Sequence, residues 1–338
     1  MDGFDTSLSQ GQQGTMDSPG HTHRDSPPGQ PPARRGGTIP GSGGLPAFEL
    51  SGPSPSAIPV LIAVPHAGRS YSEALLARLR DPAAVALRLE DRHADLLGRA
   101  VAEATGAMLA VAHAPRAMID LNRAPDDVDW DMFGLRAPAP PRGGEPAGRA
   151  RGGLGLVPRR IAGLGELWKH RHDPAELDQR IGAIHEPYHA ALADGLEGLR
   201  ARWGAALLVD LHSMPPLPPR GNGQAARFVI GDRFGATCHG SLVATAFSCL
   251  GEDRQPAAHN RPYAGGYGLE RHAAPRGGIH ALQIEVDRSC YLDSRLDRPG
   301  DGLPETAAIL ARMVARLAVE VAALGQGRAA QDWPQAAE

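Results

Sequence analysis

The sequence predicts an α/β fold, with a mostly parallel or mixed central sheet and helices on both faces. Apolar runs alternate with amphipathic segments along the 338 residues, and this alternation is typical of strands that are joined by crossover helices. Hydrophobic residues make up 42% of the chain, which is enough for the core of one large domain. In sheets of this kind a functional site lies at the carboxyl ends of the strands.

The first predicted elements follow from short apolar runs. Residues 58–65 are continuously apolar, as in a parallel strand that is buried on both faces. Residues 91–104 place their apolar side chains on one face of a helix, and Asp91 is a plausible N-cap. Two further apolar runs, at 107–113 and 117–121, are candidate strands.

The second half of the chain continues the alternation. Residues 134–160 are rich in Gly, Pro and Arg, and we expect a long loop there, either a functional lid or disordered. The remaining predicted elements are a long helix at 174–202, strands at 205–211, 228–230 and 281–286, and a final amphipathic helix at about 304–324.

Composition also predicts the domain organisation. Residues 1–46 are rich in Gly and Pro and poor in apolar side chains, so burial cannot offset their ordering entropy. We therefore expect a disordered tail at 1–46 and a second one at 327–338. Between the two tails, residues 57–326 are expected to form a single α/β domain that carries the loop at 134–160.

Charge and cysteine content exclude several classes of protein. Lys and Arg number 35 against 38 Asp and Glu, and this balance argues against a general nucleic-acid binder. No run of 18 apolar residues predicts a membrane span. The three cysteines form no C-x-x-C pair and suggest neither a disulfide framework nor a thiolate zinc site. Because the first residues also lack the pattern of a signal peptide, we expect a cytoplasmic protein.

Polar side chains stand where the predicted strands end. Imidazole and carboxylate together are a typical zinc ligand set, and a catalytic zinc needs three protein ligands and one open position. A further carboxylate is then needed to accept the proton of water. These residues therefore suggest a metal site, and the alternative is a set of ordinary buried polar residues. The residues concerned are His66, Asp120, Asn122, Arg123, Asp210, His212, Ser213, Glu285 and Asp287.

A second pattern competes with this one. His185-Glu186-Pro187-Tyr188-His189 matches H-E-x-x-H, the motif of zincin metalloproteases. That motif lies inside a helix, where a proline costs about 3 kcal/mol. We therefore favour a helix that begins or kinks at Pro187, with His189 on its surface or packed inside, and keep the zincin as the alternative.

Six motifs, in this order, resemble the N-formylglutamate amidohydrolase family from about Val60 to Leu292. That family is similar to zinc carboxypeptidases and aspartoacylase-type deacylases, which implies a zinc-carboxypeptidase-like hydrolase fold. The motifs are Pro65-His66-Ala67-Gly68-Arg69, Glu90-Asp91-Arg92, Ile119-Asp120-Leu121-Asn122-Arg123, Val209-Asp210-Leu211-His212-Ser213, Asn260-Arg261-Pro262-Tyr263-Ala264-Gly265-Gly266-Tyr267 and Leu282-Gln283-Ile284-Glu285.

The resemblance implies a role for each matching residue. Zn²⁺, or another divalent metal, would be held by His66, Asp91 and His212, with Glu285 as general base and later proton donor. In the related enzymes a Glu ligand follows the first His by three residues. Here that position is Arg69, so Asp91, or alternatively Glu90, would replace the missing carboxylate.

Substrate-binding roles follow from the same resemblance. Asn122 and Arg123 would bind a substrate carboxylate, and the fork of the guanidinium suits bidentate pairing. Arg69 and Arg116 would polarise the scissile carbonyl or bind a second carboxylate. Gly265 and Gly266 would let the backbone approach the ligand closely, and Asp210 would orient a ligand histidine.

The implied activity is hydrolysis of the N-formyl or N-acyl amide of an acidic amino acid. N-formyl-L-glutamate would give formate and L-glutamate, a reaction of histidine degradation. The implied partner is thus a small-molecule N-acyl amino acid, with no nucleic acid and no membrane; the oligomeric state is left open. Two alternatives are a metallocarboxypeptidase-like hydrolase of peptide ends and a non-catalytic small-molecule binding protein of the same fold.

Overall fold

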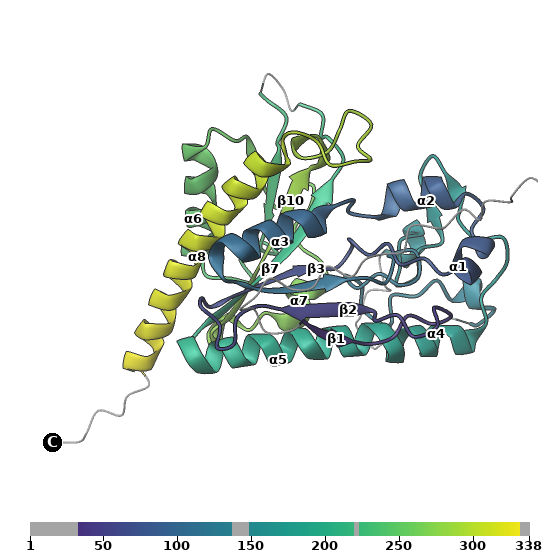
Figure 1. Ribbon diagram of the computed structural model, residues 1–338, viewed down its shortest axis with the longest axis horizontal. Coiled ribbons are helices and arrows are strands. Elements are labelled where there is room, and N and C mark those ends of the chain that lie inside the picture. Colours follow the sequence, from purple (N-terminus) through teal and green to yellow (C-terminus); the bar gives the residue numbers. More distant parts are fainter. Residues whose placement is uncertain (1–32, 137–148, 220–222, 332–338) are drawn as a thin grey trace, which may run out of the picture. The chain divides into compact units, whose positions relative to one another are not determined.

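Four parallel strands form the middle of the central sheet in the computed structural model, which describes residues 33–136, 149–219 and 223–331 (Figure 1). They lie side by side in the order β4, β3, β7, β10. β3 (Val60–Val64) and β7 (Ala206–Met214) are buried along their whole length, because helices cover both faces of the sheet. β4 (Met108–Ala112) and β10 (Ile279–Asp287) flank them.

Antiparallel neighbours complete an eight-stranded mixed sheet, so the predicted fold class is confirmed. β2 pairs with β4 and β8 pairs with β10, both antiparallel. β1 and β9 form the two edges. The outer strands are β1 (Arg34–Gly36), β2 (Phe48–Ser51), β8 (Phe228–Gly231) and β9 (Ala257–His259), and a separate ribbon pairs β5 (Arg160–Ile161) with β6 (Gly165–Glu166).

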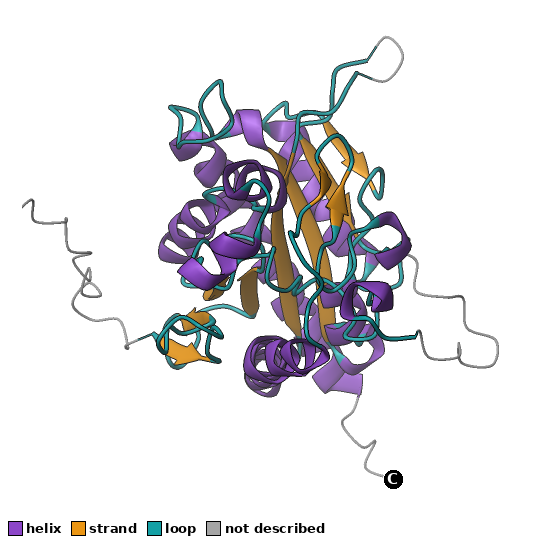
Figure 2. Ribbon diagram, turned by 90° about the vertical axis from the view of Figure 1, so that its right-hand side faces the viewer, coloured by secondary structure: helices purple, strands orange, loops and turns teal. Residues whose placement is uncertain are grey.

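Helices pack on both faces of the sheet, as Figure 2 shows. α3, α6 and α8 share one apolar core with the sheet, and α5 and α7 contribute to the core on the opposite face. The helices are α1 (Glu73–Arg78), α2 (Pro82–Leu89), α3 (Ala94–Thr105), α4 (Pro174–Arg180), α5 (Glu186–Trp203), α6 (Gly240–Glu252), α7 (Tyr267–His272) and α8 (Leu303–Gln331). No helix of the described part has the length and hydropathy to cross a bilayer.

Strand alternation decides which side chains reach the site. On β7, Leu207, Val209 and Leu211 point into the core beneath α3 and α8. Asp210 and His212 occupy the alternate positions of the strand and so point to the other face. The predicted site therefore lies on the face that α5 covers.

Two predicted elements near the site differ in the structure. Residues 117–121 form a turn rather than a strand, because the N–H of Asp120 donates to Leu156 O and the Asp120 carboxylate accepts the N–H of Asn122. Helix α3 begins at Ala94 with His93 as its N-cap. Asp91 is not a helix cap, because its carboxylate faces His212.

The long helix expected at 174–202 consists of α4, a π-helical turn at Ile181–His185, and α5. The backbone stays helical from α4 through the π turn into α5, so no helix begins at Pro187. The carbonyl group of Ala183, four residues before the proline, accepts the N–H of Thr38 at 2.9 Å, so the missing N–H of Pro187 leaves no unpaired acceptor there. The π-helical turn thus accommodates the proline inside a continuous helix, and His189 is packed inside.

The structure also differs at the expected tails. β1 pairs with β2 from Arg34 onward, and Ile39 is buried, so residues 33–46 join the fold. α8 extends to Gln331, beyond the expected end at 326. Residues 1–32, 137–148 and 332–338, where the sequence predicted most of the two tails and part of the loop, lie outside the described residues.

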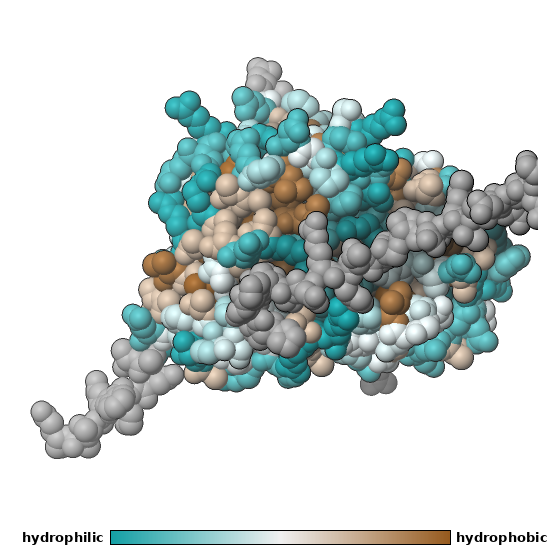
Figure 3. Space-filling model, viewed as in Figure 1, coloured by the Kyte–Doolittle hydropathy of each residue, from teal (hydrophilic) through white to brown (hydrophobic). Residues whose placement is uncertain are grey.

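Polar side chains cover most of the surface seen in Figure 3. Apolar residues gather over α8, where Val319 is largely exposed.

Candidate active site

The candidate site lies at the carboxyl ends of the parallel strands. His66 lies two residues after the end of β3, and its carbonyl accepts the backbone N–H of Asp91 at 2.9 Å. His212 on β7 and Glu285 on β10 are register partners in the parallel pair. Four chain segments thus bring two imidazoles and two carboxylates together.

His66, Asp91 and His212 form a group that can hold a metal ion. His212 Nδ1 lies 3.0 Å and His66 Nδ1 3.6 Å from Oδ2 of Asp91. All three residues are at most 3% exposed. His66 Nδ1 is buried and has no hydrogen-bond partner among the described residues. An orphaned imidazole nitrogen facing a carboxylate is what a bound cation would satisfy, so these residues fit a metal.

A carboxylate holds the other ring nitrogen of each histidine. His66 Nε2 lies 2.7 Å from Asp120 Oδ1, and His212 Nε2 lies 3.0 Å from Asp210 Oδ2. Such carboxylate partners fix the tautomer that leaves Nδ1 free to coordinate. The sequence suggested this position for Asp210 but not for Asp120, although Asp120 stands two residues before Asn122 in the D-x-N-R pattern.

The acidic groups of the site differ in their proton affinity. Burial opposes ionisation of Asp91 and Asp120, but the pKa of both carboxyls lies well below the usual range. Hydrogen bonds from His212 and His66 lower the pKa of Asp91, and the charge of Arg116 with that of His66 lowers the pKa of Asp120. Burial raises the pKa of Glu285 to about 7, against the pull of His212. Gln283 Nε2 donates to Oε1 of Glu285 at 3.0 Å and orients that carboxylate.

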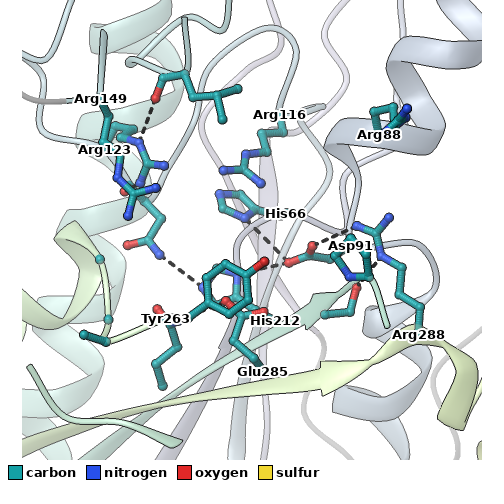
Figure 4. Close-up of a pocket in the computed structure, with 18 residues that line it drawn as sticks. His66, Arg88, Asp91, Arg116, Arg123, Arg149, His212, Tyr263, Glu285 and Arg288 are labelled. Atoms are coloured by element: carbon teal, nitrogen blue, oxygen red, sulfur yellow. Dashed lines mark hydrogen bonds and ion pairs between the residues drawn. The ribbon is translucent and has the colours of Figure 1, made fainter. Parts of the chain in front are cut away.

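A cavity of about 260 Å³ opens over this group. In the view of Figure 4, Arg123 and Arg149 lie on one side of the histidines, and Arg88 and Arg288 lie on the other. Arg116 stands beside His66, and Asp120 Oδ2 accepts from its guanidinium at 2.9 Å. Five arginines in one small pocket favour an anionic ligand.

Sequence reasoning missed some residues of this pocket. Arg88, Arg149, Arg288 and Gln283 line it, and so does Tyr263, for which packing seemed the simpler role. Gln283 alternates with Glu285 on β10, so strand periodicity could have identified it. The three other arginines come from separate segments and carry no local motif.

Two hydrogen bonds hold Asn122. Its N–H donates to Asp120 Oδ1 at 2.9 Å, and its Oδ1 accepts the N–H of Gly268 at 2.8 Å. A Cβ on Gly266 would come within 2.4 Å of Asn122 Oδ1. The structure therefore adds a reason for this glycine: it makes room for Asn122. Gly265 has φ +113°, a conformation that favours glycine.

Three sequence candidates lie apart from the metal group. Arg69 is paired with Asp95 at 2.9 and 3.0 Å and does not line the pocket. Glu90 is paired with Arg92 at 2.8 Å, which leaves Asp91 as the carboxylate between the histidines.

The H-E-x-x-H segment is the third. His185 and His189 are buried and face backbone carbonyl groups, while Glu186 between them is exposed. A zincin needs that glutamate beside its metal, so the structure does not favour the zincin alternative.

Comparisons with known proteins identify the family of this chain. The model of the family described as N-formylglutamate amidohydrolase matches residues 58–292. The N-formylglutamate deformylases of Pseudomonas aeruginosa and Pseudomonas putida are 29% and 30% identical over 242 and 241 residues. These alignments cover 70% of this chain and 84% and 82% of the relatives.

Solved structures show the same likeness. The crystal structure of N-formylglutamate amidohydrolase from Ralstonia eutropha is 31% identical, with a TM-score of 0.72, over 81% of this chain and 98% of that chain. A gene product of Agrobacterium tumefaciens is 17% identical with a TM-score of 0.59, over 83% of this chain and 96% of that one, and shows the fold alone.

The fold, the site and these relatives define a hydrolase that acts on a carbon–nitrogen amide bond. The chain belongs to the N-formylglutamate amidohydrolase family, as the six motifs indicated.

Proposed function

We propose that the chain hydrolyses N-formyl-L-glutamate to formate and L-glutamate and that the reaction depends on Zn²⁺. One observation carries the proposal: Nδ1 of His66 and Nδ1 of His212 converge on Oδ2 of Asp91, beside Glu285 and inside a pocket lined by arginines. The names of the relatives support the choice of substrate.

His66, Asp91 and His212 would hold the ion. Two imidazoles and one carboxylate leave room for water in a tetrahedral site. When bound, Zn²⁺ lowers the pKa of water and polarises a carbonyl group. Asp120 and Asp210 keep the two rings in the tautomer that coordinates through Nδ1.

Glu285 moves the proton. Its pKa of about 7 leaves the carboxylate able to take a proton from water and to return it at neutral pH. The oxygen of water forms a bond to the formyl carbon, the carbon–nitrogen bond breaks, and the proton goes to the departing nitrogen. Formate and the free amine of glutamate result.

Fixed cations orient the dianionic substrate. Asn122 and Arg123 bind one carboxylate, and Arg123 lies at the side of the pocket opposite Arg88 and Arg288. Arg116, anchored by Asp120, stabilises the oxyanion that develops on the formyl oxygen. An apolar side-chain pocket of the kind that a carboxypeptidase needs has no counterpart in this cationic lining.

Substrate comparison tests this proposal. Formate release is measured with N-formyl-L-glutamate and N-formyl-L-leucine, and amino-acid release with a short peptide that ends in glutamate. We expect N-formyl-L-glutamate to be preferred at least 10²-fold in kcat/KM, because leucine lacks the side-chain carboxylate and leaves arginines of the pocket without their anionic partner. Equal turnover of the leucine compound, or faster hydrolysis of the peptide, would contradict the proposed substrate.

The setting of the reaction follows from the same resemblance. We place the activity in the cytoplasm and in amino-acid catabolism, at the step of histidine degradation that removes a formyl group. All three cysteines are buried and free, which suits a reducing compartment.

A further inference from the structure

The H-E-x-x-H segment, which runs from the last residue of the π-helical turn into α5, contacts the turn that carries Asn122 and Arg123. His185 Nε2 lies 2.9 Å from the carbonyl oxygen of Arg123. His189 Nε2 lies 3.0 Å from the carbonyl oxygen of Leu121. The two histidines thus bind the backbone on either side of Asn122.

The side chain and N–H groups of this turn have partners elsewhere, but its carbonyl groups have few. Among the hydrogen bonds of the described residues, the carbonyl groups of Leu121, Asn122 and Arg123 accept none from a backbone N–H. The carbonyl of Asn122 accepts at 2.7 Å from the guanidinium of Arg123, which belongs to the turn itself. His185 and His189 are therefore the residues that bind the carbonyl groups of Arg123 and Leu121.

The partners determine where the ring protons lie. A carbonyl oxygen only accepts hydrogen bonds, so His185 and His189 must each carry a proton on Nε2. Nδ1 of His189 then accepts from Nε2 of His272, at 2.9 Å. His272 belongs to α7, the helix whose Gly268 N–H binds the side chain of Asn122.

Burial keeps this arrangement neutral. His185 and His189 are 1% exposed, and Tyr267 packs against both rings. Burial lowers the pKa of His189 to about 2 and that of His272 to about 4. Each ring therefore keeps one donor and one acceptor across the neutral range.

We propose that His185 and His189 are positioning residues, which fix the Asn122–Arg123 turn as a preformed carboxylate clamp, and that His272 sets the tautomer of His189. The inference rests on the proposed function in one respect, that this turn binds the substrate carboxylate. It assigns the H-E-x-x-H segment to substrate binding rather than to metal binding.

The test uses the zinc-loaded full-length protein and the variants His185→Leu, His189→Leu and His185→Gln. Leucine removes the donor, whereas the glutamine amide places a donor near the position of Nε2. We expect each leucine variant to raise KM for N-formyl-L-glutamate about 10- to 100-fold, with kcat within about threefold, because the clamp acts on ground state and transition state alike. His185→Gln should stay within about threefold of the wild type in both constants.

Hydrogen exchange followed by mass spectrometry gives a readout that needs no substrate. We expect exchange at residues 119–124 to be about tenfold faster in the leucine variants, with zinc content unchanged. His280→Leu is the matched control, because His280 is also buried but lies near the start of β10, away from the site. It should change neither KM nor exchange at 119–124.

Unchanged KM and unchanged exchange in the leucine variants would overturn the proposal. So would loss of zinc in proportion to activity, or a His185→Gln variant as impaired as His185→Leu. If the wild type releases no formate at all, the proposed function fails. The exchange measurement then decides the positioning role by itself. Faster exchange confined to residues 119–124 in the leucine variants would support that role, and unchanged exchange there would contradict it.

Discussion

A methyl group on Gly266 should displace Asn122. The backbone of Gly266 has φ −105° and ψ −157°, which alanine adopts without strain, so the effect of Gly266→Ala is steric. A Cβ there would lie 2.4 Å from Oδ1, 2.5 Å from Cγ and 2.5 Å from Nδ2 of Asn122. Rotation of the amide cannot relieve contacts with all three atoms.

The size of the effect follows from these distances. Ordinary contact begins at 3.4 Å, so the side chain must move by about 3.4 − 2.4 = 1.0 Å. A displacement of about 1 Å at a positioning group can cost about 10²-fold in rate. We expect Gly266→Ala to lower kcat/KM for N-formyl-L-glutamate about 10²-fold, mainly through KM, while zinc content stays at the wild-type level.

Two further variants make this prediction specific. Gly198→Ala adds the same methyl group on α5, where nothing lies within 4 Å, and should leave the kinetics unchanged. In an Asn122→Ala background, Gly266→Ala should cost little, because the group it displaces is already gone. Steady-state formate assays compare the wild type with Gly266→Ala, Gly198→Ala, Asn122→Ala and the double variant of Asn122→Ala and Gly266→Ala. An undiminished 10²-fold loss of kcat/KM on adding Gly266→Ala to Asn122→Ala would refute the steric explanation.

Three other substitutions give equally direct tests. Glu285→Gln should lower kcat about 10²- to 10⁴-fold and keep the metal, as formate and metal assays will show; full activity would remove Glu285 as the proton carrier. Asp120→Asn should weaken zinc affinity about 10- to 100-fold in a competitive chelator titration, because His66 loses its charged partner; unaltered affinity would contradict the tautomer argument. His280 has a pKa lowered by burial to about 4, against an ordinary value of 6.5, so the unfolded chain alone binds this proton between those pH values and stability falls as pH drops from 6.5 to 4. At pH 5 this lowers the free energy of unfolding by about 2 kcal/mol. Urea unfolding of the chelated protein at pH 7.5 and pH 5 should show a drop smaller by that amount in His280→Leu, but not in His170→Gln, a control at an exposed position. Parallel pH dependences of His280→Leu and the wild type would refute this assignment to His280.

The sequence predicted the strands of the sheet's middle because their signals are local. Val60–Val64 and Ala206–Met214 are apolar runs of strand length, and burial on both faces requires that composition. The edge strands were not predicted, because Arg34–Gly36 and Ala257–His259 are three residues long and carry no periodicity. Their pairing depends on neighbours that are distant in the sequence.

The site residues show the same difference between local sequence signals and contacts with distant residues. His66, Asp91, His212 and Glu285 could be singled out because each follows or ends an apolar segment inside a motif, and the structure brings all four together. Arg69 had a motif as well, but a charge 26 residues away, that of Asp95, holds its guanidinium.

His185 and His189 belong to a motif that suggested a metal site, which the structure does not favour. H-E-x-x-H fixes which residues share a helix face but not what that face meets. The turn of Leu121–Arg123, rather than a metal, lies opposite, and that information comes from tertiary packing.

Metal removal and return tests the central claim most directly. Formate release from N-formyl-L-glutamate and zinc content are measured on the purified protein before chelation, after chelation, and after zinc is added back. We expect chelation to abolish formate release and zinc to restore it at one ion per chain. A double variant, His66→Ala with His212→Ala, should bind no zinc and stay inactive. Full release from the chelated, zinc-free protein would contradict a metal site at His66, Asp91 and His212 as the basis of the activity.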